Sequence, residues 1–123
     1  MKANDNLTIL VVDDEKSVRD LLAMGLSRAR PTTTTLRAEG GVQALNLLAA
    51  NPVDLVVTDL TMPGMNGLDL LKEIKVKYPD LPVILASGSI DEADIQKAIA
   101  SGAIAYLEKP FHPKAILEAV EAL

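Results

Sequence analysis

Five side chains that can bind a metal or a phosphate stand at the ends of short apolar stretches in the sequence. They are Asp13 and Asp14 after residues 7–12, Asp59 after residues 53–58, Ser87 after residues 83–86, and Lys109 just beyond residues 103–107. The stretches are short and rich in β-branched residues, which favours buried strands over helices. Because the carboxyl ends of parallel strands share one edge of a sheet, where ligands bind, we expect these side chains to meet in one pocket.

This set of side chains indicates phosphoryl chemistry that depends on a metal ion. Three crowded carboxylates repel one another unless a cation lies between them, and oxygen ligands alone favour Mg²⁺. Lys109 could neutralise a phosphate oxygen, and the Ser87 hydroxyl could donate a hydrogen bond to another. Asp59 then has the position of a nucleophile, because a carboxylate can accept a phosphoryl group and become an aspartyl-phosphate. Such a transfer needs mainly positioning and charge neutralisation.

Apolar residues at helical spacing predict a helix after each of the five strands. In the first helix, which should end near Ala29, the residues expected to face the core are Val18, Leu21, Leu22 and Leu26. A fourth helix should be capped by Asp91, present Ile95, Ala98 and Ile99 to the core, and end at a left-handed Gly102. Pro113 should open the last helix, after His112 in a loop or capping position.

The alternation of strands and helices predicts an α/β fold in which an open, doubly wound parallel sheet carries helices on both faces. Residues 32–38 are polar but β-prone, so we expect them to form an edge strand. The chain has 123 residues, of which 49 % are hydrophobic and 2 % aromatic. This length fits one domain over residues 1–123, with an aliphatic core and no room for an output domain.

Charge and composition exclude several classes of function. The net charge is −5 and the basic residues are scattered, which argues against direct binding of nucleic acid. There is no cysteine, so neither a disulfide nor a thiolate metal site can form. The polar N-terminus and the lack of a long apolar run predict a cytoplasmic protein without a signal peptide or a membrane span.

Four motifs in this order resemble the receiver domain of bacterial two-component response regulators, the chemotaxis-regulator type included. They are Val11-Val12-Asp13-Asp14-Glu15, Thr58-Asp59-Leu60-Thr61-Met62-Pro63-Gly64-Met65-Asn66-Gly67, Ala86-Ser87-Gly88 and Tyr106-Leu107-Glu108-Lys109-Pro110-Phe111. The resemblance covers essentially the whole chain. It implies a flavodoxin-like, five-stranded sheet in the order 2-1-3-4-5 with five helices.

The resemblance also implies a role for each site residue. Asp59 is similar to the phosphoacceptor and Lys109 to the lysine that pairs with the phosphoryl group. The Mg²⁺ ligands implied are Asp14, Asp59 and the main-chain carbonyl of Thr61, with Asp13 assisting through water. Ser87 and Tyr106 resemble the switch hydroxyl and the switch aromatic, and the peptide bond between Lys109 and Pro110 is expected to be cis.

The function implied is that of a signalling module that catalyses only its own phosphorylation and dephosphorylation. A sensor histidine kinase or a histidine phosphotransfer protein would donate the phosphoryl group to Asp59. The phosphorylated form would change the face made by the fourth helix, fifth strand and fifth helix, and thereby the affinity for an unknown output partner or domain. The chain would be a monomer or a phosphorylation-dependent dimer. Ile104 and Ala105 replace the paired acids that mark one large DNA-binding subfamily.

Three other functions are less well supported by the sequence. A Mg²⁺-dependent phosphatase with an aspartyl nucleophile typically needs a second acid two residues later, where this chain has Thr61. A nucleotide-binding protein would need a glycine-rich turn after the first strand, which here is Asp13-Asp14-Glu15. A receiver that no longer accepts phosphate is not favoured, because all the expected site residues are present. The sequence leaves open whether the chain is a single-domain regulator or a receiver taken from a longer protein.

Overall fold

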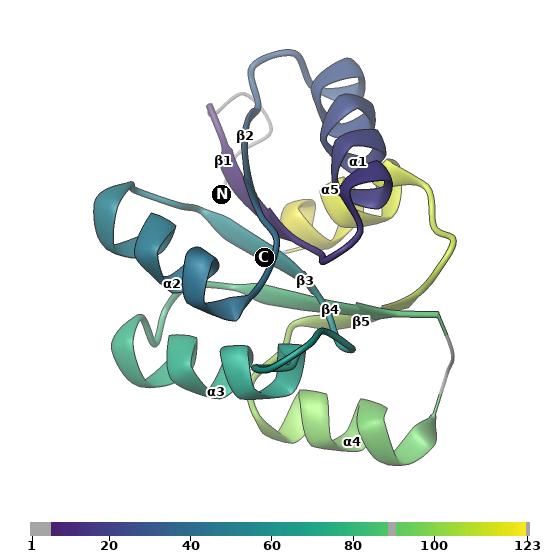
Figure 1. The fold of residues 1–123 in the computed structure, drawn as a ribbon. Coiled ribbons are helices and arrows are strands. Elements are labelled where there is room, and N and C mark those ends of the chain that lie inside the picture. Colours follow the sequence, from purple (N-terminus) through teal and green to yellow (C-terminus); the bar gives the residue numbers. More distant parts are fainter. Residues whose placement is uncertain (1–5, 89–90, 123) are drawn as a thin grey trace.

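Five parallel strands form one sheet in the order β2-β1-β3-β4-β5, as expected from the sequence (Figure 1). The structure is a computed structural model that describes residues 6–88 and 91–122. The strands are β1 (Thr8–Val12), β2 (Thr34–Ala38), β3 (Leu55–Asp59), β4 (Val83–Ser87) and β5 (Ala105–Glu108). The polar strand β2 lies at the edge of the sheet, which confirms the prediction for residues 32–38, although the strand begins at Thr34.

A helix follows each strand, and the helices cover both faces of the sheet (Figure 1). They are α1 (Lys16–Ala29), α2 (Gly41–Ala50), α3 (Gly67–Lys77), α4 (Glu92–Ala100) and α5 (Pro113–Glu121). Helices α1 and α5 lie together on one face, and α2, α3 and α4 lie on the other. This is the doubly wound α/β arrangement that the sequence predicts. Among the described residues, no helix is both long and apolar enough to cross a membrane.

The core consists of two apolar layers, one on each face of the sheet. Alternate residues of a strand point to opposite faces. In β3, Leu55 and Val57 belong to the layer under α1 and α5, whereas Val56 belongs to the layer under the other three helices. Every residue of β3 and β4 is buried, which is why these strands are nearly continuous apolar runs in the sequence.

Two predicted core residues are exposed. The Leu21 side chain on α1 is 72 % exposed, and Ile99 on α4 is 51 % exposed. In α1, Ala23 and Leu26 are the buried residues, and in α4 only Ala98 is, among the residues described. Successive residues of a helix are about 100° apart around its axis, so a narrow contact with the sheet leaves Leu21 and Ile99 at its margin. The apolar pattern predicts the helices correctly but overestimates the width of their buried faces.

Local signals at the helix ends are confirmed. The Asp91 side chain accepts a hydrogen bond from the Ala93 N–H, and the ring of His112 accepts one from the Lys114 N–H. Pro113 is the first residue of α5. Gly102, after α4, has a φ of 104°, a left-handed conformation that favours glycine.

Candidate functional site

The register of the sheet brings the ends of the strands level. Asp59 of β3 is paired with Ala86 of β4, and Ser87, the next residue, is paired with Glu108 of β5. On the other side of β3, Val12 of β1 is paired with Thr58, so Asp13 leaves the sheet beside Asp59. The side chains selected from the sequence are therefore brought to one edge of the sheet by strands that are distant in sequence.

Three carboxylates gather at this edge. One oxygen each from Asp13, Asp14 and Asp59 lies within 4.8 Å of the others. Asp13 and Asp59 are buried, at 3 % and 9 % exposure, whereas Asp14 is exposed. A cluster of carboxylate oxygens, open to solvent on one side, has the donor chemistry of a Mg²⁺ site that keeps some of its waters. The cluster could therefore hold a metal ion.

Lys109 is the counter-ion of this cluster. Its Nζ lies 2.6 Å from Asp13 Oδ2 and 3.3 Å from Asp59 Oδ1. The Lys109 N–H also donates a hydrogen bond to the Ser87 carbonyl oxygen at 2.6 Å, which ties the loop after β5 to the end of β4. Among the described residues, Lys109 pairs with two of the three carboxylates, and Asp14 has no ion-pair partner, so the cluster keeps negative charge that a divalent cation would offset.

The pKa values of Asp59 and Lys109 are both raised. Burial raises the pKa of Asp59 and the charge of Asp13 adds to it, against the lowering effect of Lys109 and of a backbone hydrogen bond from Thr61. Burial acts in the opposite direction on Lys109, but its hydrogen bond to Asp13 and the charges of both aspartates outweigh this and raise its pKa. Burial thus disfavours the charged form of the Asp59 carboxylate, and a bound cation would relieve this.

Thr61 and Tyr106 occupy different surroundings. Thr61 is exposed, and its backbone hydrogen bond to the Asp59 carboxylate places the two residues side by side. Tyr106 is half-buried in β5, where it packs against the apolar layer under α2, α3 and α4. The peptide bond between Lys109 and Pro110 is cis, as the resemblance implies.

A cleft with a volume of about 240 Å³ opens beside the carboxylates. Its charged residues are Asp13, Asp59 and Lys109, and the rest of its wall is apolar. The apolar lining is Val11, Val12, Val18, Leu21, Leu22, Val57, Ala86, Pro110, Phe111 and Pro113. Asp59 therefore borders a largely apolar space, whose lining does not include Asp14, Thr61 or Ser87.

Two residues that shape the site could not be identified from the sequence pattern. At Gly67, an added Cβ would lie 2.2 Å from the Asp59 carbonyl oxygen, so helix α3 begins directly against the chain that carries Asp59. Arg19 of α1 donates a hydrogen bond from Nη1 to the main-chain oxygen of Asp13 at 2.8 Å. In the sequence, Gly67 stands in a loop rich in glycine and proline, and Arg19 is a basic residue in the first turn after the acid pair. Neither position by itself reveals the contact that the residue makes.

Comparison with known proteins identifies the family. The model of the response regulator receiver domain matches residues 9–121. The chain belongs to this family. It is therefore a receiver domain of two-component response regulators, a family whose members accept a phosphoryl group.

Relatives of two kinds share this receiver sequence. The chain is 36 % identical over 118 residues to a chemotaxis protein CheY homolog of Campylobacter jejuni, covering 94 % of this chain and 90 % of that protein. It is 43 % identical over 103 residues to the DNA-binding transcriptional regulator NtrC of Escherichia coli, covering 84 % of this chain. The match spans only 22 % of the length of NtrC.

A solved structure confirms the fold. The signal receiver domain of an HD domain-containing protein from Pseudomonas fluorescens superposes with a TM-score of 0.87 at 35 % identity. The match covers 96 % of this receiver chain and 94 % of that one. The flavodoxin-like fold expected from the sequence is thus confirmed.

Proposed function

We propose that this receiver takes a phosphoryl group onto the Asp59 carboxylate from the phosphohistidine of a sensor kinase or a phosphotransfer protein. The observation that carries the proposal is the position of Asp59, which ends β3 beside Asp13 and Asp14 and within 3.3 Å of Lys109. A carboxylate oxygen of Asp59 forms the new O–P bond while the P–N bond of the donor breaks. The histidine leaves with the electron pair of that bond.

Lys109 and Ser87 would bind the phosphoryl oxygens. The Lys109 ammonium already lies against Asp59 Oδ1, so it is placed to neutralise the charge that arrives with the phosphoryl group. Ser87 ends the neighbouring strand β4, and its buried hydroxyl is proposed as the group that moves onto the phosphoryl oxygen. Neither residue has to transfer a proton, since the reaction depends on orientation and charge.

The metal ion proposed for the site is Mg²⁺. Asp14, Asp59 and the main-chain carbonyl of Thr61 would bind it, with Asp13 assisting, and the cluster of carboxylate oxygens supports this assignment. When bound, Mg²⁺ supplies positive charge that offsets the charge of the carboxylates and the phosphoryl oxygens.

The output of the switch is proposed to be a changed surface at α4, β5 and α5. Movement of Ser87 would favour an inward position of the Tyr106 ring, which is half-buried in the present structure. Ile99 of α4 is exposed in the same region of the molecule and could contact a partner. We propose no catalytic activity on other substrates.

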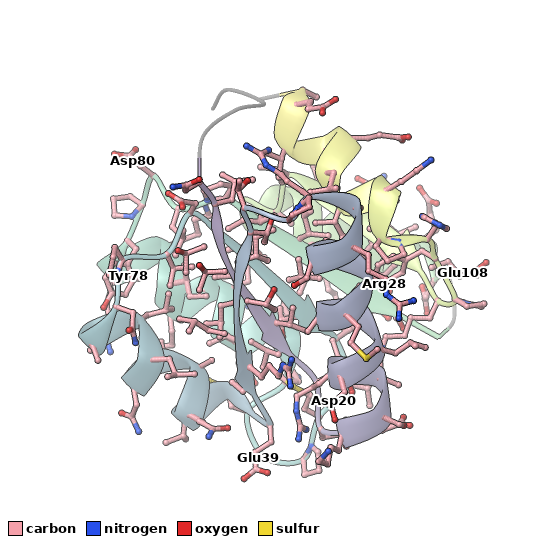
Figure 2. The ribbon with its side chains drawn as sticks, turned by 90° about the horizontal axis from the view of Figure 1, so that it is seen from above. Asp20, Arg28, Glu39, Tyr78, Asp80 and Glu108 are labelled. Carbon is pink, nitrogen blue, oxygen red and sulfur yellow. The ribbon has the colours of Figure 1, made fainter. Side chains whose placement is uncertain are left out.

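The experiment that tests this function is measurement of the intact mass after incubation with acetyl phosphate. We expect the wild-type protein to gain one phosphoryl group in the presence of Mg²⁺ and none in EDTA. Asp59→Asn should gain none under either condition. Asp80→Asn is the matched control, because Asp80 is an exposed acid that lies across the molecule from Glu108, the neighbour of Lys109 (Figure 2). It should be phosphorylated like the wild type.

A phosphoryl group on Asp59→Asn, or equal phosphorylation in Mg²⁺ and in EDTA, would contradict the proposed chemistry. Absence of any adduct on a folded wild-type protein, together with failure to bind a beryllofluoride mimic, would mean that the pocket does not accept phosphate.

A further inference from the structure

Arg19 reaches back from the first turn of α1 to the loop that carries two of the carboxylates. Its Nη1 donates a hydrogen bond to the main-chain oxygen of Asp13 at 2.8 Å. Long side chains on a helix point toward its N-terminus, which allows a residue at this position to contact the preceding loop. The guanidinium therefore joins the helix to the segment between β1 and α1.

Asp13 is held from four directions. Its N–H donates to the Ala38 carbonyl oxygen at 3.1 Å, and its Oδ1 accepts from the Glu15 N–H at 2.9 Å. Its Oδ2 accepts from Lys109 at 2.6 Å, and its carbonyl oxygen accepts from Arg19. The contacts with Ala38 and Lys109 fix the strand end and the carboxylate, and the contact with the Glu15 N–H closes the turn across Asp14. The contact with Arg19 fixes the peptide group that follows.

That peptide group determines the direction of Asp14. The Asp13 carbonyl lies in the rigid plane that ends at the Asp14 Cα, so holding the oxygen orients the next residue. Asp14 is exposed, and within residues 6–88 and 91–122 no hydrogen bond or ion pair holds its carboxylate. Glu15, the N-cap of α1, makes no capping hydrogen bond with its side chain. Among the described residues, the turn is therefore held by two contacts on Asp13, the Glu15 N–H on its Oδ1 and the Arg19 guanidinium on its carbonyl oxygen.

We propose that Arg19 is a positioning residue of the metal site, which orients Asp14 toward the cation by holding the Asp13 carbonyl. This inference rests on the proposed Mg²⁺ site of Asp13, Asp14 and Asp59. Arg19 does not contact the metal and does not take part in the transfer of the phosphoryl group.

The direction in which loss of Arg19 changes the Mg²⁺ affinity distinguishes a positioning role from a purely electrostatic one. A cation on α1 near the carboxylates repels Mg²⁺, so loss of that charge by itself would tighten Mg²⁺ binding. Loss of the hydrogen bond would instead free the Asp13–Asp14 peptide and weaken binding. Partners that orient metal ligands typically contribute about 10- to 100-fold in affinity. Because the two effects have opposite signs, the direction of the change in affinity separates them.

The test is calorimetric titration of Mg²⁺, without a phosphodonor, into the full chain and its Arg19 variants. Arg19→Met and Arg19→Leu, which have no hydrogen-bond donor, are expected to raise the Kd for Mg²⁺ about tenfold. Arg19→Lys keeps a charged donor, and we expect its affinity to fall between those of Arg19→Met and the wild type. Arg28→Met removes the same kind of side chain from the last turn of α1 and should not change the Kd (Figure 2). Thermal melting without Mg²⁺ gives the structural effect of each change separately.

An unchanged or tighter Mg²⁺ affinity in Arg19→Met, or in Arg19→Leu if the first variant folds poorly, would overturn the proposal. Equal affinities of Arg19→Lys and Arg19→Met would also overturn it, because the donor would then be irrelevant. If the wild type itself bound no Mg²⁺, the metal site would be wrong. A wild type that binds Mg²⁺ with variants that bind it equally would leave the metal site standing and refute only the role of Arg19.

Discussion

Replacing Lys109 by methionine is expected to slow phosphorylation by acetyl phosphate about 100-fold, the usual effect of removing one group that stabilises developing charge. The same change should tighten the binding of Mg²⁺ several-fold. Lys109 Nζ lies 2.6 Å from Asp13 and 3.3 Å from Asp59, so the ammonium and the metal ion neutralise the same carboxylates. Without the ammonium, the metal ion no longer competes with a second cation for these carboxylates. The phosphoryl group loses the positive charge that would neutralise it.

Lys109→Met should also destabilise the protein in the absence of Mg²⁺. Loss of one partner from a buried ion pair leaves uncompensated charge, and because the Lys109 side chain is 22 % exposed we expect about 2 kcal/mol instead of the full cost. Mg²⁺ should therefore raise the melting temperature of this variant more than that of the wild type. Lys114→Met, at an exposed position on α5, is the matched control and should change none of these quantities.

These opposed effects can be measured with initial rates of phosphorylation and a Mg²⁺ titration on the same samples. A Lys109→Met protein that is phosphorylated at the wild-type rate would show that the ammonium does not assist the transfer. Weaker Mg²⁺ binding in this variant would contradict the view that Lys109 and the metal compete for one set of oxygens.

Gly67→Ala is expected to lower the free energy of unfolding by about 3 kcal/mol, at the upper end of the usual cost of overpacking. An alanine Cβ would lie 2.2 Å from the Asp59 carbonyl oxygen and 2.9 Å from the Leu60 Cα. Both are backbone atoms of the segment that carries the phosphoacceptor, so they cannot yield as the end of a flexible side chain can. The Gly67 N–H also donates to the Leu60 carbonyl oxygen at 2.8 Å, which keeps the two segments together.

The close contact between Gly67 and the Asp59 backbone also affects phosphorylation. Relief of the clash requires α3 or the end of β3 to move, and this would displace Asp59 from Lys109 and from the other carboxylates. We expect Gly67→Ala to be phosphorylated slowly even at temperatures where it is folded. Gly40→Ala is the control, because nothing lies within 4 Å of an added Cβ there, and its cost should stay near 1 kcal/mol at this N-cap position.

Urea unfolding monitored by circular dichroism measures both variants. If Gly67→Ala proves as stable as Gly40→Ala and is phosphorylated normally, then the close approach of α3 to Asp59 is not required for the site.

The order of elements and the location of the site could be predicted because each depends on local sequence. Short apolar runs that end in an acid, a serine or a lysine predict buried strands whose carboxyl ends carry the chemistry. The distances between these groups depend on the register of strands that are far apart in sequence. Asp59 pairs with Ala86, and Ser87 pairs with Glu108, through hydrogen bonds of the assembled sheet.

Features that depend on contact between elements could not be predicted. Leu21 and Ile99 fit the apolar pattern of their helices but lie outside the area that the sheet covers. The role of Gly67 depends on how closely α3 approaches β3, and that of Arg19 on the direction in which α1 leaves the loop. The spacing of apolar residues along one helix shows neither how closely α3 approaches β3 nor in which direction α1 leaves the loop.

The central claim is that Asp59 is the residue that carries the phosphoryl group, and the most direct test is to locate that group chemically. Borohydride reduces an acyl phosphate to an alcohol, so an aspartyl-phosphate becomes homoserine, which tandem mass spectrometry of the digested protein can place. We predict homoserine at position 59 alone, and only after phosphorylation in the presence of Mg²⁺. Homoserine at position 13 or 14, or a phosphate that resists borohydride on Ser87, would contradict this account.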